Sequence, residues 1–384
     1  MKEMPLPSFD LTRNWKRVRA ETLAAINVVL DSQHFILGPE VEALEKDLAA
    51  YLGTASTVGC ASGTDALLLA LMALDLGPGD EVITTPFSFF ATASCVTRLG
   101  ATPVFADVLP GSYNIDPKEV LRKVTPRTKA VIPVHLFGQM SRVEEFAPLL
   151  EEKGISIVED CAQAIGATRS VGGKTQRAGT IGELGCFSFF PTKNLGCFGD
   201  GGLISVSSER LDRRLRSLRA HGSGEEYFHD EVGLNSRLDA LQAAILRVRL
   251  RHLETWNEER RLVAERYRIL FAEHDLGEWV TPPLEEKGNR HVYHQYVVRC
   301  RSRDLLKENL AGKGITTRVY YPLSLHLQPC FSYLGYGRGD MPVSENLTEE
   351  VLALPIFPEL EPGEQERVVQ AISDFYRRHK SDHS

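Results

Sequence analysis

Alternation between short apolar runs and longer amphipathic segments constrains the fold of this chain more than any other feature. Residues 40–52, 143–154 and 209–222 carry apolar residues at helical spacing. Between the helical segments lie runs rich in β-branched and aromatic residues, which we predict to be strands: 56–60, 81–85, 102–107, 129–138, 155–160, 185–190 and 201–206. Strands that alternate with helices predict a mostly parallel sheet with helices on both faces.

The pattern changes at about residue 237. A charge-rich helical stretch, 237–271, is followed by a strand, a helix, a second strand and two more helices, the first three at 293–300, 304–314 and 316–323. We therefore expect an α/β chain with a large sheet domain, residues 1–250, that includes an N-terminal arm. A smaller α+β domain would follow in residues 251–384, with the boundary inside the long helix.

Composition and charge exclude several classes of protein. The net charge is -7, whereas nucleic-acid binders usually carry a basic balance, and the densest basic run, 208–222, is typical of a helix with a solvated face. The seven cysteines are scattered without CxxC spacing, which argues against a disulfide framework and a zinc site. We find no signal-peptide core and no apolar run of about 20 residues, so we expect a cytoplasmic protein without a membrane span.

The most unusual residue is Lys193, in the segment CFSFFPTKNLGCFGDGG at 186–202. An apolar strand ends at Phe190, Pro191 breaks it, and the lysine stands on the loop beyond. Ligands of parallel sheets bind outside the carboxyl ends of the strands. Lysine is seldom placed among apolar residues unless it is paired or used chemically, although a solvated loop lysine is the ordinary alternative.

Three other segments follow predicted strands. The segment SGTDAL, 62–67, opens a helix, so its free N–H groups form either a phosphate site or an ordinary N-cap. Glu159 and Asp160 end a predicted buried strand. A carboxylate at this position either faces a ligand or caps a helix, and Gln163, three residues on, could reach the same side. The segment TPFSFFATA, 85–93, holds three phenylalanines that pack in the core or stack on a flat cofactor.

Taken together, these segments describe a site for an aromatic phosphate that reacts with an amine. Pyridoxal phosphate has these properties, because its aldehyde forms a Schiff base with lysine. Its ring nitrogen requires a carboxylate partner, and its phosphate requires N–H and hydroxyl donors. We therefore predict pyridoxal 5'-phosphate as the cofactor.

With PVHLFGQ, LNSRLDALQAA and YYPLSLHLQP, these segments resemble the DegT/DnrJ/EryC1/StrS family of sugar-nucleotide aminotransferases over nearly the whole chain. The resemblance implies an aspartate-aminotransferase-like fold (fold type I of the pyridoxal-phosphate enzymes) and a homodimer with active sites at the subunit interface. The resemblance also implies residue roles: Lys193 as the Schiff-base lysine, Asp160 at the pyridine nitrogen, Gln163 near the ring hydroxyl, Phe89 stacked on the ring, and Gly63, Thr64, Ser188 and the neighbouring subunit's Asn235 on the phosphate.

The chain departs from the family pattern at two places. Many members carry histidine where this chain has Ile165, so a polar role at that position is missing here. Many also have GNGTDAL where this chain has ASGTDAL. We expect Gly63 and Thr64 to serve nonetheless, because the implied phosphate contact is made by the backbone.

The resemblance implies transfer of an amino group from L-glutamate to a nucleotide-linked keto-sugar in polysaccharide, lipopolysaccharide or small-molecule glycosylation. Lys193, freed as a neutral amine of lowered pKa, would move the proton. A dehydrating branch carries histidine at this position, so the lysine favours transamination. The motifs look most like the branch that acts on 3-keto hexoses, either UDP-linked N-acetylhexosamine derivatives or dTDP-linked deoxyhexoses.

Substrate contacts and two alternative functions stay open. Substrate-side candidates are Arg237, Tyr320, Tyr321 and His326; the arginine could instead form a structural ion pair, and the other three could pack the domain interface. A 4-keto sugar aminotransferase of the same family is the alternative enzyme. A pyridoxal-phosphate-binding regulatory protein without turnover is the alternative from another class.

Overall fold

A seven-stranded sheet organises the larger part of the computed structural model, which describes residues 4–225 and 227–381. The strand order is β1-β9-β8-β5-β4-β2-β3, and only β9 runs antiparallel to its neighbours. The strands are β1 (Ser56–Cys60), β2 (Glu81–Thr84), β3 (Thr102–Phe105), β4 (Thr128–Ile132), β5 (Ser156–Asp160), β8 (Leu184–Ser188) and β9 (Gly202–Val206). The predicted mostly parallel sheet is confirmed. The strand expected at 129–138 ends earlier, because Pro133 has no N–H to donate.

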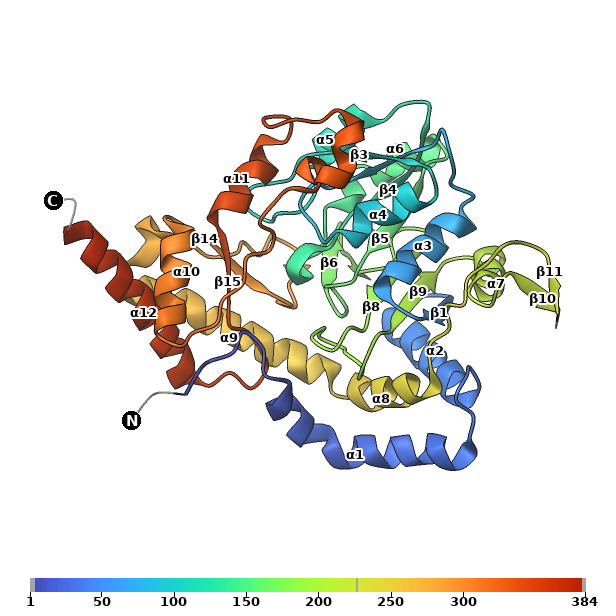
Figure 1. The fold of residues 1–384 in the computed structure, drawn as a ribbon, viewed down its shortest axis with the longest axis horizontal. Coiled ribbons are helices and arrows are strands. Elements are labelled where there is room, and N and C mark those ends of the chain that lie inside the picture. The colour runs from blue at the N-terminus through green and yellow to red at the C-terminus, as the bar shows by residue number, and fades with distance from the viewer. Residues whose placement is uncertain (1–3, 226, 382–384) are drawn as a thin grey trace.

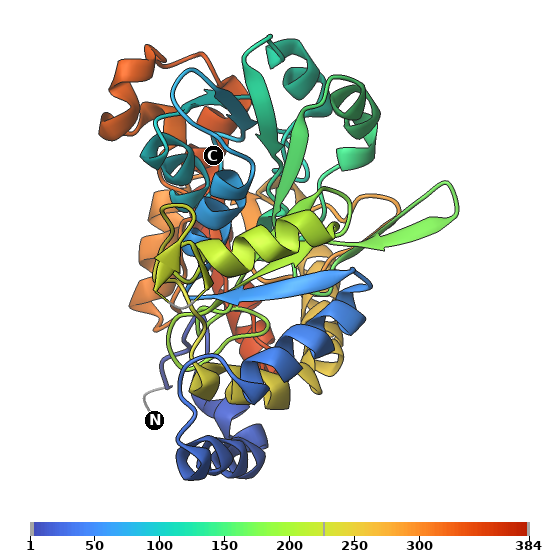
Figure 2. The same ribbon diagram turned by 90° about the vertical axis from the view of Figure 1, so that its right-hand side faces the viewer.

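Helices cover both faces of this sheet (Figures 1 and 2). Leucines of α3 (Gly63–Ala73) and α7 (Glu209–Leu218) share one apolar cluster with the sheet, and α4 (Ala91–Arg98) joins them. On the opposite face lie α2 (Pro39–Leu52), α5 (Pro117–Lys123), α6 (Ala147–Glu152) and α8 (Ala240–Leu250). Figure 2 shows α7 and α2 on opposite sides of β1. Covered faces explain why β2 and β9 are buried along their whole length.

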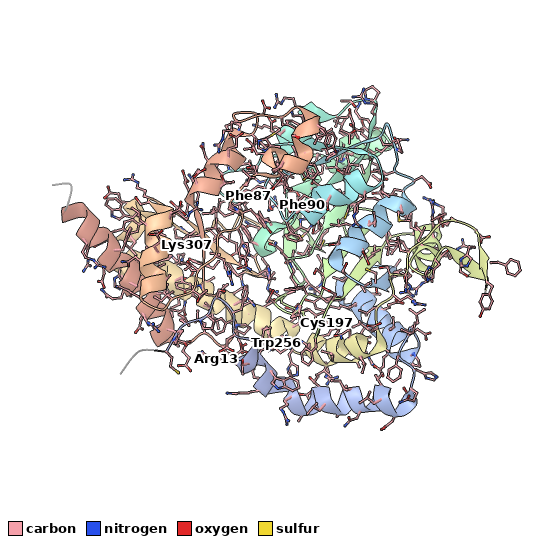
Figure 3. All side chains as sticks on the ribbon, in the orientation of Figure 1. Arg13, Phe87, Phe90, Cys197, Trp256 and Lys307 are labelled. Carbon is pink, nitrogen blue, oxygen red and sulfur yellow. The ribbon has the colours of Figure 1, made fainter. Side chains whose placement is uncertain are left out.

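A long N-terminal helix, α1 (Leu11–Ser32), was not predicted. Its apolar residues do not mark its buried face, since Asn14 and Thr22 are buried whereas Leu23, Val28 and Leu30 are exposed. The start of α1 is nevertheless encoded, because the Asp10 carboxylate accepts hydrogen bonds from the N–H groups of Thr12 and Arg13. Val18 packs with Val248 and Trp256, and Figure 3 labels Trp256 above the N-terminal part of α1.

The C-terminal part is an α+β unit around a three-stranded antiparallel sheet of order β12-β14-β15. Its elements are α9 (Leu253–Glu273), β12 (Val280–Thr281), β14 (Tyr296–Cys300), α10 (Arg303–Gly312), α11 (Pro342–Glu350), β15 (Val351–Leu354) and α12 (Pro362–Ser381). One apolar cluster combines Leu6 with residues drawn from 263–376 only. This separate core is what a domain boundary near residue 250 requires, and the boundary itself stays a prediction.

Three element predictions were wrong in detail. The helical stretch 237–271 is two helices, α8 and α9, and the side chains of Arg249 and His252 stack on Trp256 at the break. Segment 316–323 forms no regular strand; Arg318 alone bridges to Ala353, and Pro322 removes a ladder donor. The helix predicted at 143–154 is divided into a 3-10 turn, η2 (Val143–Glu145), and α6, which begins at Ala147 and has Pro148 in its first turn.

Small elements complete the chain. A ribbon of β6 (Thr168–Val171), β7 (Lys174–Arg177) and β13 (Asn289–Arg290) lies beside the sheet, and the hairpin of β10 (Ser223–Glu225) and β11 (Phe228–His229) projects at the right of Figure 1. The other 3-10 turns are η1 (Leu136–Gly138), η3 (Leu276–Glu278), η4 (Leu325–Leu327) and η5 (Pro329–Leu334). Within the described residues, every helix is too short or too polar to cross a membrane.

Candidate active site

A cavity of about 410 Å³ opens at the carboxyl ends of β1, β2, β4, β5 and β8. Loops after parallel strands meet at one edge of the sheet, so the segments singled out in the sequence converge there. The cavity brings together most of the predicted site residues: Gly63, Thr64, Phe89, Asp160, Gln163, Ser188, Lys193, Tyr320 and Tyr321.

Lys193 is placed by a tight turn directly after β8. Its N–H donates to the Phe190 carbonyl at 2.8 Å, and the loop then folds back over Pro191. Only glycine fits at the next bend, since a Cβ on Gly196 would lie 2.5 Å from the Pro191 carbonyl oxygen. Burial lowers the pKa of Lys193 from 10.5 to about 8, against the opposing effect of the Asp160 carboxylate. The lysine therefore has a substantial neutral fraction near neutral pH.

Asp160 and Glu159 end the same strand and point to opposite sides, as alternation along a strand requires. The Glu159 carboxylate faces away from the cavity and accepts from His135 Nε2 at 2.7 Å and from the N–H groups of Gly179, Ile181 and Gly182 at 2.7–3.0 Å. It is a buried structural anchor, although His135 and Cys161 stand close enough to share a metal ion with it. Asp160 alone faces the ligand side.

The Asp160 carboxylate is held from two directions. Thr92 Oγ1 donates to Asp160 Oδ2 at 2.8 Å, and the Ala162 N–H donates to Oδ1 at 3.1 Å. Burial raises the pKa of Asp160, while these hydrogen bonds and the positive charge of Lys193 act in the opposite direction. Thr92 was missed in the sequence because nothing in its own segment distinguishes it from other threonines at helix starts.

The start of α3 forms a close-fitting cradle. Ser62 Oγ accepts from the Asp65 N–H at 3.0 Å, which leaves the first-turn N–H groups of Gly63 and Thr64 for an anion. Ser188 lies against the cradle, where a Cβ on Gly63 would come within 2.6 Å of Ser188 Cβ. A Cβ on Gly202 would likewise lie 2.2 Å from the Ser62 carbonyl oxygen. Both glycines are therefore required by packing.

The aromatic and amide residues complete the walls. Phe89 is 60% exposed at the cavity, so its ring is available to cover a ligand. Figure 3 labels Phe87 and Phe90 in the same loop, between α11 and α4. The Gln163 amide is fixed, since Oε1 accepts from the Phe137 N–H at 2.8 Å and Nε2 donates to the Tyr321 hydroxyl at 3.1 Å. Burial raises the pKa of Tyr321, so its hydroxyl stays protonated.

Three predicted site residues lie outside the cavity lining. His326 is 1% exposed and pairs through Nε2 with Glu345 Oε1 at 3.2 Å, so it is packed in the interior of its own chain, and its substrate contact stays a prediction. Asn235 is exposed and forms a backbone bridge with Ala220. Arg237 is half-buried. Neither Asn235 nor Arg237 lines the cavity of its own chain.

Comparisons with known proteins show what this chain is similar to. The model of the DegT/DnrJ/EryC1/StrS aminotransferase family matches residues 16–373. The chain is 47% identical to a "pleiotropic regulatory protein" of Geobacillus stearothermophilus, covering 97% of this chain and 99% of the relative. It is 45% identical to the UDP-N-acetyl-3-dehydro-alpha-D-glucosamine 3-aminotransferase of Acidithiobacillus ferrooxidans, and the match covers 96% of this chain and 97% of that relative.

Among solved structures, DesV of S. venezuelae matches with a TM-score of 0.93 and 41% identity over 97% of this chain and 99% of that chain. A DegT/DnrJ/EryC1/StrS aminotransferase from Brucella abortus matches with a TM-score of 0.90 and 37% identity over 96% of this chain and 99% of that chain. These likenesses confirm the predicted aspartate-aminotransferase-like α/β fold. The chain belongs to the DegT/DnrJ/EryC1/StrS aminotransferase family.

Proposed function

We propose that this protein is a pyridoxal-phosphate-dependent aminotransferase that transfers an amino group from L-glutamate to a nucleotide-linked 3-keto hexose, such as a UDP-N-acetyl-3-keto-hexosamine derivative. The convergence of Lys193 and Asp160 in one cavity at the sheet edge carries this proposal. The names of relatives support the 3-keto position, since they include a UDP-N-acetyl-3-dehydro-glucosamine 3-aminotransferase and a dTDP-3-amino-3,4,6-trideoxy-glucose transaminase of Streptomyces venezuelae that is 41% identical.

The cavity has the shape and the donors that this cofactor requires. Gly63 and Gly202 leave a cradle that a Cβ would fill, beside the free N–H groups of the α3 first turn. We assign the phosphate to Gly63, Thr64 and Ser188, the ring face to Phe89, and the ring hydroxyl side to Gln163. When bound, pyridoxal phosphate supplies an aldehyde for exchange between amines and a ring that withdraws electrons.

Asp160 and Lys193 would control the protons of the reaction. Asp160, fixed by Thr92 and by the Ala162 N–H, would hold a proton on the ring nitrogen through its buried carboxylate. Lys193, with its pKa lowered to about 8 by burial, would accept a proton from the substrate carbon as a neutral amine and return it on the other side of the transfer. Tyr320 and Tyr321 border the remaining space and are our candidates for substrate contact.

We further infer a homodimer in which the neighbouring subunit completes the site. Asn235 and Arg237 lie outside the cavity of their own chain, so they are candidates to contact ligands in the cavity of the partner subunit. The nearby hairpin and the residues that follow it carry exposed apolar side chains, with Tyr227 86%, Phe228 70% and Val232 90% exposed. Uncovered apolar surface of this kind marks an interaction face. We also propose a cytoplasmic location and a domain boundary near residue 250.

The test is the near-visible absorbance of purified protein before and after L-glutamate, for wild type and Lys193→Ala. We expect wild type to show the band of the lysine-bound cofactor and to lose it with glutamate. The variant should lack that band. A wild type that binds the cofactor but ignores glutamate and other amino donors would refute transamination.

Two alternatives remain, and the absorbance test separates only the first of them from the proposed function. A regulatory protein without turnover is favoured by the name of the 47% identical relative, and it predicts cofactor binding with no response to amino donors. A 4-keto sugar aminotransferase predicts the glutamate response together with amination of 4-keto rather than 3-keto nucleotide sugars. The intact pair of Lys193 and Asp160 favours catalysis over regulation alone.

A further inference from the structure

His294 forms part of the cavity wall, and nothing in the sequence singles it out. The residue precedes β14, is 4% exposed, and lines the same cavity as Lys193. The ring of Phe9 stacks on the imidazole at a centroid distance of 6.3 Å. An imidazole is therefore packed in place beside the lysine.

Hydrogen bonds determine which ring nitrogen of His294 carries the proton. Asn194 Nδ2 lies 3.0 Å from the Val292 carbonyl oxygen, and a carbonyl only accepts, so this Asn194 atom is the amide nitrogen. The other amide atom, Asn194 Oδ1, lies 3.2 Å from His294 Nδ1. An amide oxygen also only accepts, so His294 Nδ1 must be the N–H donor.

A second amide holds Asn194 in this orientation. Asn257 Nδ2 donates to the Ile165 carbonyl at 3.2 Å, and Asn257 Oδ1 accepts from Asn194 Nδ2 at 2.7 Å. Gly166 provides the room for this contact, because a Cβ there would lie 2.4 Å from Asn257 Nδ2. Reversing the Asn194 amide would place its oxygen against two acceptors, which fixes the direction of the whole series of hydrogen bonds.

The imidazole is neutral, which leaves a lone pair on Nε2. Burial lowers the pKa of His294 well below its ordinary value, and the positive charges of Lys193 and Arg260 act in the same direction. Gln295 Nε2 lies 3.5 Å from His294 Nε2, at the outer limit of a hydrogen bond. His294 Nε2 therefore keeps its capacity to accept from a stronger donor in the cavity.

We propose that His294 is a positioning residue for Lys193: its Nε2 atom accepts a hydrogen bond from the free lysine amine and holds that amine toward the reacting carbon. The inference rests on the proposed aminotransferase function. The amine of a freed lysine sits on a flexible four-carbon chain, so a fixed acceptor restricts where its nitrogen can stand. Misplacement of a reacting group by about 1 Å can cost about 100-fold in rate.

The test is the single-turnover reaction of the cofactor-loaded enzyme with L-glutamate, followed by the loss of visible absorbance. We would compare wild type, His294→Ala and His294→Gln. We expect His294→Ala to lower the rate constant by about 100-fold without a matching change in the half-saturating glutamate concentration. His294→Gln, which retains an acceptor, should be at least about tenfold faster than His294→Ala, and added imidazole should accelerate His294→Ala.

His291 supplies the matched control. It is 2% exposed, burial lowers its pKa to about 3, and it lies outside the cavity lining. His291→Ala should therefore retain the wild-type rate constant. A His294→Ala rate constant within twofold of wild type would overturn the proposal, as would a His294→Gln variant no faster than His294→Ala. Failure of the proposed function itself is distinct, because wild type would then show no response to L-glutamate.

Discussion

The ionisation of Lys193 in the apoenzyme is the most direct quantitative test of the site. The change to make is Asp160→Asn, which removes the carboxylate that favours the charged lysine. We expect the apparent pKa of Lys193 to be about 8 in wild type and to fall in the variant. The sign follows from the two causes: burial disfavours the ammonium form, and Asp160 is the group that opposes burial.

The size of the effect decides whether Lys193 can act as a base. With its pKa lowered from 10.5 to about 8, about one quarter of the lysine is neutral at roughly pH 7.5. An unperturbed lysine would be neutral in only about one molecule per thousand at the same pH. Burial therefore raises the concentration of reactive amine by about two orders of magnitude.

The assay is brief acetylation of the cofactor-free protein across a pH series, with modification of Lys193 measured by peptide mass spectrometry. A free lysine derivative in the same tube supplies the unperturbed reference. Asp107→Asn is the matched control, because Asp107 is 7% exposed, close to the 5% of Asp160, but hydrogen-bonds the start of α11.

Two results would refute the reasoning. A wild-type midpoint near that of free lysine would mean that the cavity does not desolvate the amine. A midpoint that rises or stays fixed in Asp160→Asn would mean that this carboxylate does not govern the lysine. The control variant should leave the Lys193 midpoint where it is in wild type.

Two more predictions concern the cofactor site. Gly63→Ala should lower the free energy of unfolding of the apoenzyme by about 1–3 kcal/mol, because its Cβ would lie 2.6 Å from Ser188 Cβ. Gly77→Ala, with no atom within 4 Å of its Cβ, should not destabilise, and equal denaturant midpoints for the two variants would contradict the packing argument. Thr92→Val should weaken cofactor binding by about tenfold or more in an absorbance titration, since it removes the 2.8 Å hydrogen bond to Asp160. Thr92→Ser, which keeps the hydroxyl, should bind as wild type does.

Most strands of the sheet and several site residues could be predicted from short segments of the sequence. The strands of the large sheet are rich in apolar and β-branched residues, and the Ser62 side chain begins α3 as its N-cap. The segments that carry chemistry stand directly after these strands. Their convergence then followed from the general rule that parallel strands share one functional edge.

Elements held by tertiary contact were harder to predict. Helix α1 buries polar residues such as Thr22 and is held by contacts such as Val18 with Trp256, so its apolar pattern does not follow its buried face. The break between α8 and α9 depends on stacking around Trp256. The partner of His326 could not be predicted either, because Glu345, which pairs with it in the interior, lies nineteen positions away in the chain.

The sequence by itself determined how strands and helices alternate along the chain and which chemical groups follow each strand, because both depend on residues that are close together in the sequence. The tertiary structure decided how those groups behave. It turned Asp160 toward the cavity and Glu159 away, and it lowered the pKa of Lys193 by burial. It also set the tautomer of His294 through amides that are 37 to 100 residues away in the chain. Burial and long-range hydrogen bonds arise only when distant segments pack together, so no single segment contains them.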